Sequence, residues 1–258
     1  MATGPNKIRL STNPTDDAIA ALQIGDIVYL DGTIYTAREG VYMRVIEDGV
    51  DLPLDLPAVS AANFHCSPAA TQHDDGSFVL GAVTATASFR FSKWIGRWLA
   101  ASGAKLIIGK GGMSPEDYRD HFVPNGAIYL TTVGYGTGAL LGRGVKQVRE
   151  LHWKKELGLA QAMWVIEVEH FGSFIVESVV AGNSIFEREN AKIAENIEAA
   201  YEGTKPAVLK RFIETHDRQD EMVLIGTSFR IRQDSASLNF ITNASTSRIT
   251  HSFKSIAA

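Results

Sequence analysis

One segment, Gly81–Gly112, constrains the fold of this chain more strongly than any other. In its middle, apolar residues four positions apart, such as Trp94 and Trp98, lie on one face of a predicted helix. Gly103 follows where a helix commonly ends, and the apolar run Leu106–Ile108 has the length of a buried strand. This order of strand, loop, helix, strand and loop predicts an α/β layer whose loops gather at one end.

The two loops of this segment carry the side chains best suited to binding an anion. Thr86, Ser88 and Arg90 precede the helix, where hydroxyl groups, a guanidinium and helix N-terminal amides can bind an anion together. Lys110 lies between glycines, which allow a close backbone approach while the ammonium supplies a point charge. Taken alone, the motifs also fit plainer structures: a helix cap with a surface arginine, and a turn with a solvated lysine.

Other motifs give weaker indications of function. The glycine-rich stretch Gly134–Gly138 lacks the spacing of a dinucleotide-binding loop, so we expect a flexible loop or close helix packing. His65 fits a core position as well as a site, whereas the apolar-flanked Cys66 is typical of a small core residue. With a single cysteine and no histidines at metal-ligand spacing, the sequence predicts no metal site within this chain.

The remaining segments suggest how the main domain is built. Residues 1–23 are expected to form a polar N-terminal leader. Asp26–Thr36 is rich in Val, Ile, Tyr and Thr, and its Asp31-Gly32 dipeptide predicts a hairpin of two strand pieces. Met163–Val168 and Phe174–Val180 are predicted as two further strands.

A change of composition near Glu187 marks the one candidate domain boundary. We predict a main domain over residues 24–186 and a C-terminal extension, residues 187–258, that packs on the same domain. The extension is predicted to form helices over about 187–200 and 207–216, and strands over 222–232 and 237–241.

Composition and charge exclude several classes of function. The 258 residues carry a net charge of −4, which gives no reason to expect general nucleic-acid or membrane-surface binding. No apolar run approaches the ~20 residues that a membrane-spanning helix needs. One cysteine cannot form an internal disulfide, which suits a reducing compartment. We therefore expect a cytoplasmic protein with neither a membrane nor a nucleic acid as its partner.

Taken in sequence order, several motifs resemble the β-type domain of the class I fumarase and L-tartrate dehydratase family. The similarity extends from about Ile24 to Phe186 and leaves the segment after about Glu187 unmatched. The motifs are GTIYTAR at Gly32–Arg38, LPLDL at Leu52–Leu56, T-x-S-x-R at Thr86–Arg90, GKGG at Gly109–Gly112 and W-V-I-E-V-E-H-F-G…G-N-S-I-F at Trp164–Phe186. The order and distance of GTIYTAR and GKGG are the most specific part.

The resemblance implies a fold, an activity and a partner. The fold would be the swivelling β/β/α domain, here with a C-terminal extension of helices and strands. The family's enzymes add or remove water on a dicarboxylate such as fumarate/malate or tartrate/oxaloacetate. They use a 4Fe-4S cluster that three cysteines of an α-type domain hold. Because this chain has one cysteine, it would be the β subunit of an α₂β₂ oligomer, with the cluster supplied by a partner α subunit.

The resemblance also assigns roles to the side chains. Arg38 matches the arginine of the TAR motif, a ligand of the substrate carboxylate, and Arg90 and Lys110 match further substrate-binding positions. Thr86 matches the first threonine of the G-P-T-T-S-x-R-M motif and, with Ser88, is expected to be catalytic, as an acid/base group or an orienter. This set suits a dicarboxylate, because arginine holds a planar carboxylate through two parallel hydrogen bonds.

Some residues depart from the family pattern. Ala85 and Ala87 stand where the family has its proline and second threonine, Glu39 replaces an aspartate, and Tyr42 replaces a histidine. These departures leave two alternatives to the hydro-lyase. One is a stand-alone, cluster-independent carboxylate enzyme on the same fold, and the other is a non-catalytic carboxylate-binding subunit.

Overall fold

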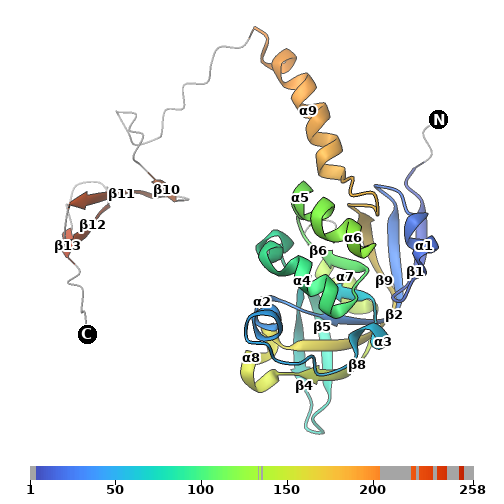
Figure 1. Ribbon diagram of the computed structural model, residues 1–258. Helices are drawn as coiled ribbons and strands as arrows, with labels where there is room; N and C mark the ends of the chain where they lie inside the picture. Colours follow the sequence, from blue (N-terminus) through green and yellow to red (C-terminus); the bar gives the residue numbers. More distant parts are fainter. Residues whose placement is uncertain are drawn as a thin grey trace. The chain divides into compact units, whose positions relative to one another are not determined.

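The computed structural model describes residues 4–132, 134, 136–203, 222–224, 227–234, 237–242 and 250–252 (Figure 1). The chain divides into two compact units, Met1–Ala200 and Tyr201–Ala258. The first unit contains every residue that the sequence singles out as part of a site. Within the described residues, no helix has both the length and the apolar character that crossing a membrane requires.

A mixed sheet of seven strands forms the centre of the first unit, in the order β1-β2-β3-β6-β7-β9-β8. β1, β2, β3, β6 and β7 run parallel to one another, while β9 runs antiparallel to β2, β7 and β8. The strands are β1 Lys7–Ser11, β2 Ile27–Thr36, β3 Ala62–Phe64, β6 Leu106–Gly109, β7 Ile128–Thr132, β8 Val145–His152 and β9 Met163–Val176. The predicted α/β class and the strand at Leu106–Ile108 are therefore confirmed.

Short helices and one separate hairpin connect these strands. The hairpin consists of β4 Cys66–Gln72 and β5 Phe78–Ala85. The helical segments are α1 Asp16–Ala20, α2 Glu39–Tyr42, η1 Met43–Glu47, α3 Leu56–Val59, η2 Ser88–Phe91, α4 Ser92–Ser102, α5 Pro115–Asp117, η3 Tyr118–Phe122, α6 Val123–Asn125, α7 Thr137–Arg143, α8 Lys154–Gln161 and α9 Ile185–Tyr201. The helix predicted around Trp94 and Trp98 is α4, and Gly103 caps it in the left-handed conformation, with φ of 64°.

Alternating side chains of the sheet divide the core between its two faces. In β6, Leu106 and Ile108 join one apolar cluster with β5 and α7, whereas Ile107 joins another with α4 and η3. This is the expected result of a strand whose successive side chains point to opposite faces. Trp94 and Trp98 of α4 pack with residues of β2 and β9 on the second face. The helix that precedes the lysine loop is thus fixed by burial of its apolar side.

The hairpin predicted at Asp31-Gly32 is wrong, because β2 continues through this dipeptide as one strand. β9 pairs along both halves of β2, and the register shifts around Leu30 and Gly32 as at a β-bulge. Gly32 has φ of 128°, and a Cβ at this position would collide with the Thr12 side chain. The Asp31 carboxylate accepts hydrogen bonds from the Arg9 guanidinium and from the backbone N–H of His170. The dipeptide therefore marks a bulge and a close approach.

Two other expectations about strands also change. The pair of strands predicted at 163–168 and 174–180 is a single strand, β9, because β2 and β7 supply partners for its second half. The expected N-terminal leader contains β1, which pairs in parallel with β2 from Lys7 opposite Ile27 to Ser11 opposite Asp31. The polar composition of this segment fits an edge strand that has only one neighbouring strand.

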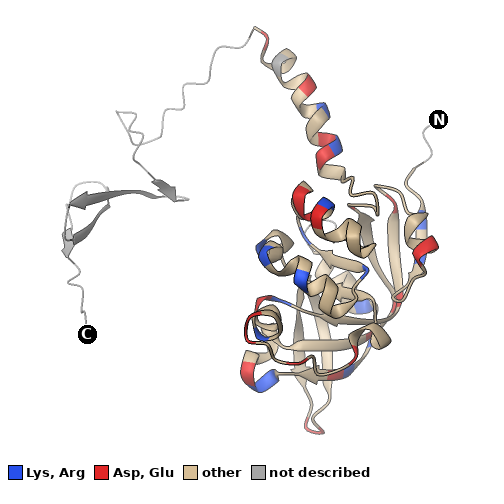
Figure 2. Cartoon of the chain, in the orientation of Figure 1, with Lys and Arg blue, Asp and Glu red and all other residues tan. Residues whose placement is uncertain are grey.

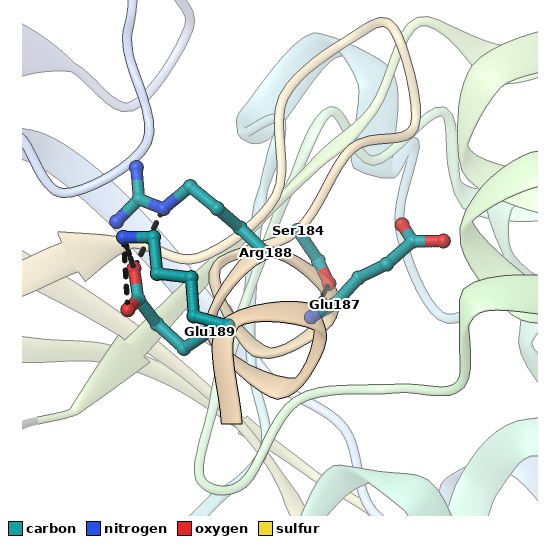
Figure 3. Close-up of polar contacts among 5 residues, drawn as sticks. Ser184, Glu187, Arg188 and Glu189 are labelled. Carbon is teal, nitrogen blue, oxygen red and sulfur yellow. Dashed lines mark hydrogen bonds and ion pairs between the residues drawn. The ribbon is translucent and has the colours of Figure 1, made fainter. Parts of the chain in front are cut away.

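The predicted helix after Glu187 is confirmed as α9. The Glu187 N–H donates to the Ser184 hydroxyl at 3.1 Å, while Arg188 and Lys192 both bind Glu189 (Figure 3). Acidic and basic residues follow one another along the helix (Figure 2). The predicted boundary at Glu187 thus lies inside a helix that the first compact unit retains to Ala200.

The second unit contains a four-stranded antiparallel sheet, in the order β10-β11-β12-β13. Its strands are β10 Met222–Leu224, β11 Thr227–Asp234, β12 Ser237–Thr242 and β13 Thr250–Ser252. The strand predicted over 237–241 is confirmed as β12. The single strand predicted over 222–232 is wrong, because β10 and β11 divide this stretch and pair antiparallel to each other. The helix predicted over 207–216 lies outside the described residues. That the extension packs on the main domain stays a prediction.

The close contact between α7 and β5 provides a test of the packing. A Cβ on Gly142 would collide with the backbone carbonyl oxygen of Gly81, which has no flexible side chain to move away. We expect Gly142→Ala to lower the free energy of unfolding by about 1–3 kcal/mol, as overpacking does, in urea denaturation. Gly81→Ala is the control, because its nearest neighbour would lie 3.8 Å away. Equal losses in both variants would contradict this packing.

Candidate active site

The two anion-binding motifs of the sequence meet at the end of strand β6. Ala87 and Lys110 pair in a parallel β-bridge. The Lys110 N–H donates to the Thr86 carbonyl at 3.2 Å, and the Ser88 N–H donates to the Lys110 carbonyl at 3.1 Å. The hydroxyl-containing segment Thr86–Ser88 therefore runs beside the loop Gly109–Gly112, which we call the lysine loop. Hydrogen bonds of the backbone set this pairing.

Arg38 follows β2 as Lys110 follows β6, so both residues lie beyond the carboxyl ends of parallel strands. In open α/β sheets, such ends are where ligands commonly bind. Arg90 forms an ion pair with Glu39 at 3.6 Å, and burial together with the charge of Arg90 lowers the pKa of Arg38. Arg38, Glu39 and Arg90 thus make one cluster with an excess of positive charge.

Arg38 keeps unused hydrogen-bonding capacity. Its Nη1 donates to the Ala160 carbonyl at 3.0 Å, which fixes the direction of the side chain. Its Nε is buried and has no hydrogen-bond partner within the described part of the chain. A buried donor without an acceptor costs free energy, so this guanidinium is suited to receiving a carboxylate oxygen.

Ser88 lies in a buried chain of hydrogen bonds. Its hydroxyl is 2.7 Å from Nδ1 of His65 and accepts a hydrogen bond of 2.6 Å from Tyr129. On the other side of the imidazole, Nε2 lies 2.6 Å from the hydroxyl of Tyr42, which accepts from the Asn63 amide at 2.9 Å. All five side chains are fully buried. The chain connects α2, β3, η2 and β7.

The network is consistent with one arrangement of protons. Burial lowers the pKa of His65 to about 3, so the imidazole is neutral at neutral pH. Because Tyr42 accepts from Asn63, its own proton is free to point at Nε2 of His65. The Nδ1–H then donates to Ser88. This arrangement satisfies His65 without a charge, and places it in the core rather than at a solvent-exposed site.

A pocket of about 520 Å³ opens beside the lysine loop. Lys110 lines it together with hydroxyl-bearing Thr84, Thr132 and Thr137 and with Gly134 and Gly136 of the glycine-rich stretch. For this stretch the sequence predicted a flexible loop or close helix packing. The close packing is present at Gly138, where a Cβ would press on Val83 and Thr84.

The structure distributes the five predicted site residues over four places. Lys110 lines the pocket, Arg38 and Arg90 share the cationic cluster, and Ser88 is buried in the hydrogen-bond network. Thr86 is half-buried and is held by its backbone, which accepts from Lys110 and donates to the His65 carbonyl at 2.6 Å.

The buried residues that hold Ser88 and His65 in place were not predicted from the sequence. Tyr129 and Asn63 were ordinary strand residues in the sequence, and Tyr42 was noted only as a replacement for histidine. The network also explains why residue 109 is a glycine, because a Cβ at this position would collide with the Ser88 hydroxyl. Only an unusual density of tyrosines in buried strands and helices could have indicated such a network.

Within the described residues, no group of three or more His, Cys, Asp and Glu side chains is placed to hold a metal ion. Cys66 is free and buried, and burial raises the pKa of its thiol.

Comparison with known proteins identifies relatives over most of the chain. A family model described as "Fumarase C-terminus" matches residues 2–189. A protein of Methanocaldococcus jannaschii named "Putative L(+)-tartrate dehydratase subunit beta" is 36% identical over 186 residues, which are 71% of this chain and 93% of that protein. The L(+)-tartrate dehydratase subunit beta of Escherichia coli K12 is 31% identical over 71% of this chain and 88% of its own length.

A further relative is a longer protein. The Geobacillus stearothermophilus protein named "Putative fumarate hydratase class I" is 28% identical over 180 residues, which are 70% of this chain and 34% of that protein. The chain therefore matches nearly all of the two subunits named beta and one part of this longer chain.

The buried network generates a prediction about stability. Ser88→Ala removes the hydroxyl that both His65 and Tyr129 use, and leaves two buried polar groups without this partner. We expect a loss of about 1–3 kcal/mol in the free energy of unfolding, measured by urea denaturation. Ser77→Ala, which removes an exposed hydroxyl bound to Asp75, is the control and should cost much less. A Ser88→Ala protein as stable as wild type would contradict the network.

Proposed function

The chain belongs to the fumarase C-terminus family, and on that premise we propose that it is the β subunit of a hydro-lyase. The reaction is the addition or removal of water on a small dicarboxylate of the fumarate/malate or tartrate class. One observation carries the proposal beyond the family match: the pairing of Ala87 with Lys110 puts the hydroxyl–arginine motif directly beside the lysine loop. This pairing supports a single site built from motifs that are weak when taken separately.

The proposed roles follow from charge and geometry. Arg38, with its unpartnered buried Nε, and Arg90 bind one carboxylate, and Lys110 binds the other from the rim of the pocket. Arginine suits a planar carboxylate because its fork of donors matches two oxygens. The Thr86 carbonyl accepts a hydrogen bond from the Lys110 N–H at 3.2 Å, and the Thr86 hydroxyl is the group that we assign to proton transfer at substrate carbon. Cationic neighbours favour such a transfer because they stabilise developing negative charge.

Ser88 takes a different role from the catalytic one that the motif suggests. Its hydroxyl is fully buried and occupied by His65 and Tyr129. We therefore assign Ser88 to positioning, since its backbone N–H binds the Lys110 carbonyl while its side chain anchors the segment to the core.

The 4Fe-4S cluster belongs to an α partner in this proposal. The chain has one cysteine, Cys66, and it is buried, so the described residues do not fit a cluster. The α subunit supplies the cluster and its cysteine ligands. What this chain contributes is the binding of carboxylates, the exclusion of water by its pocket, and the hydroxyl of Thr86.

The assembly and the location are parts of the same proposal. The match to only 34% of a longer fumarate hydratase supports a partner chain that corresponds to the remainder. We propose an α₂β₂ oligomer in the cytoplasm, with the active site between α and β. The swivelling β/β/α architecture is supported by the layers of this unit, in which the β4–β5 hairpin and the α4 helix lie on opposite faces of the main sheet.

Replacement of Lys110 tests the function. In a complex co-expressed with an α-type subunit, we expect Lys110→Ala to lower kcat/KM for fumarate or L-tartrate by about 10–100-fold, the value of one charge-assisted hydrogen bond. Lys155→Ala, on the exposed surface of α8, is the matched control and should leave the rate unchanged.

The same assay separates the two alternatives. A purified chain that hydrates or dehydrates a carboxylate without any α subunit or cluster would support the stand-alone enzyme. The alternative that Ala85 and Ala87 favour, a non-catalytic binding subunit, requires dicarboxylate binding without turnover in the complete complex. Either result would overturn the proposed role as the β subunit of a cluster-dependent hydro-lyase.

A further inference from the structure

A buried carboxyl group that no motif of the sequence singled out packs against the lysine loop. Glu177 directly follows β9 and is fully buried. A Cβ on Gly112, the last residue of the loop, would lie 3.2 Å from Cδ of Glu177, so the carboxyl group is in contact with the loop backbone. Its Oε2 accepts a hydrogen bond from the Tyr118 hydroxyl. Its Oε1 is buried without a hydrogen-bond partner in the described part of the chain.

Tyr118 connects this carboxyl group to the backbone of the loop. The Tyr118 hydroxyl accepts a hydrogen bond of 2.8 Å from the N–H of Met113, the residue that follows the loop. One residue earlier, the N–H of Gly112 interacts with the hydroxyl of Tyr129. Two tyrosine hydroxyls thus hold consecutive amides at the end of the lysine loop. The Tyr118 hydroxyl in turn donates to Glu177, and the Tyr129 hydroxyl donates to Ser88 of the buried network described above.

The surroundings of Glu177 favour its neutral form. Burial raises the pKa of Glu177 to about 7, and the hydrogen bond from Tyr118 offsets part of this effect. The titratable side chains that face it are Tyr118 from η3 and Tyr129 from β7. The Phe186 ring at the start of α9 packs on the same glycine, Gly112. Among the described residues Glu177 forms no ion pair, so no cation balances its charge when it ionises.

We propose that Glu177, through Tyr118, positions the lysine loop for an anionic ligand, and that the loop binds the anion best while Glu177 carries a proton. A proton on Glu177 leaves the loop with the full positive charge of Lys110. Loss of that proton places a buried negative charge against the loop backbone, where salt screens it poorly. By linkage, a bound anion also makes Glu177 hold its proton more strongly. The effect on catalysis depends on the proposed function, whereas the effect on the loop does not.

The first test measures the stability of the full chain as a function of pH. In the unfolded chain Glu177 loses its proton near its ordinary pKa of 4.5, and in the folded chain it does so at about 7. Between these values the folded chain holds a proton that the unfolded chain has lost, so the unfolding free energy falls as pH rises. Below pH 4.5 both states are protonated, and this cost is absent.

Glu177→Gln should therefore lose this fall in stability between about pH 4.5 and 7, because the amide cannot ionise but keeps an oxygen for Tyr118. Glu116→Gln, an exposed glutamate paired with Arg119, is the matched control and should follow the wild-type pH profile. Parallel profiles for wild type and Glu177→Gln would overturn the proton-dependent part of the proposal.

The second test examines the loop itself by hydrogen exchange of the Met113 amide in the full chain. Tyr118→Phe removes the acceptor of this amide, and we expect its exchange to accelerate by about tenfold or more, as loss of a hydrogen bond of about 1.4 kcal/mol would produce. Tyr29→Phe, at a half-buried tyrosine stacked on His170, is the control. Unchanged exchange at Met113 in Tyr118→Phe would overturn the positioning role.

The third test measures binding of L-tartrate and of fumarate to the α–β complex by calorimetry at pH 6 and pH 8. We expect wild-type affinity to fall by about fivefold or more across this interval, the lower end of typical coupling between sites. Glu177→Gln should bind equally at both values. A Glu177→Gln complex with the wild-type pH dependence would overturn the proposal. If neither ligand binds at any pH, the proposed function fails for these substrates, and stability and exchange still decide the role of Glu177.

Discussion

The hydrogen bonds between the Thr86–Ser88 segment and Lys110 hold the proposed site together. They are backbone bonds at the carboxyl end of β6, so they form only when the chain after β5 returns to the main sheet. The segment that they attach carries the hydroxyl of Thr86 and, two residues after Ser88, the guanidinium of Arg90. If this bridge were lost, the lysine and the hydroxyl–arginine motif would be two unrelated surface loops.

Ser88 also belongs to a network of buried polar side chains, which links helices and strands through hydrogen bonds. Buried polar groups are costly unless each has a partner. In this network the Oδ1 of Asn63 is buried and has no hydrogen-bond partner among the described residues. His65 remains neutral, and Ser88 accepts from it and from Tyr129. Tyr42 is a member of this network, because its hydroxyl both accepts from Asn63 and lies within hydrogen-bond distance of His65.

Among the described residues, the cationic groups occupy two places. Lys110 lines the pocket, while Arg38 and Arg90 form a separate cluster with Glu39. This arrangement agrees with the proposed β subunit, because the active site would then be completed by the α partner, which supplies the cluster and the remaining wall. The buried Glu177 and its two tyrosine neighbours show that the lysine loop is supported from inside the domain as well as by its bridge.

The sequence alone determined the features that depend on short spacing and local chemistry. The four-residue spacing of Trp94 and Trp98 and the glycine after the helix predicted α4, and the order of the motifs identified the family. Local pattern failed where long-range pairing decided the result. Asp31-Gly32 has the composition of a turn, yet β9 pairs along both halves of β2 and makes it a bulge. The tertiary structure also decided that Ser88 is buried and that Glu177 lies against the lysine loop. Contacts between residues 41 or 65 positions apart leave no periodic signal in a sequence, because only the folded chain brings them together.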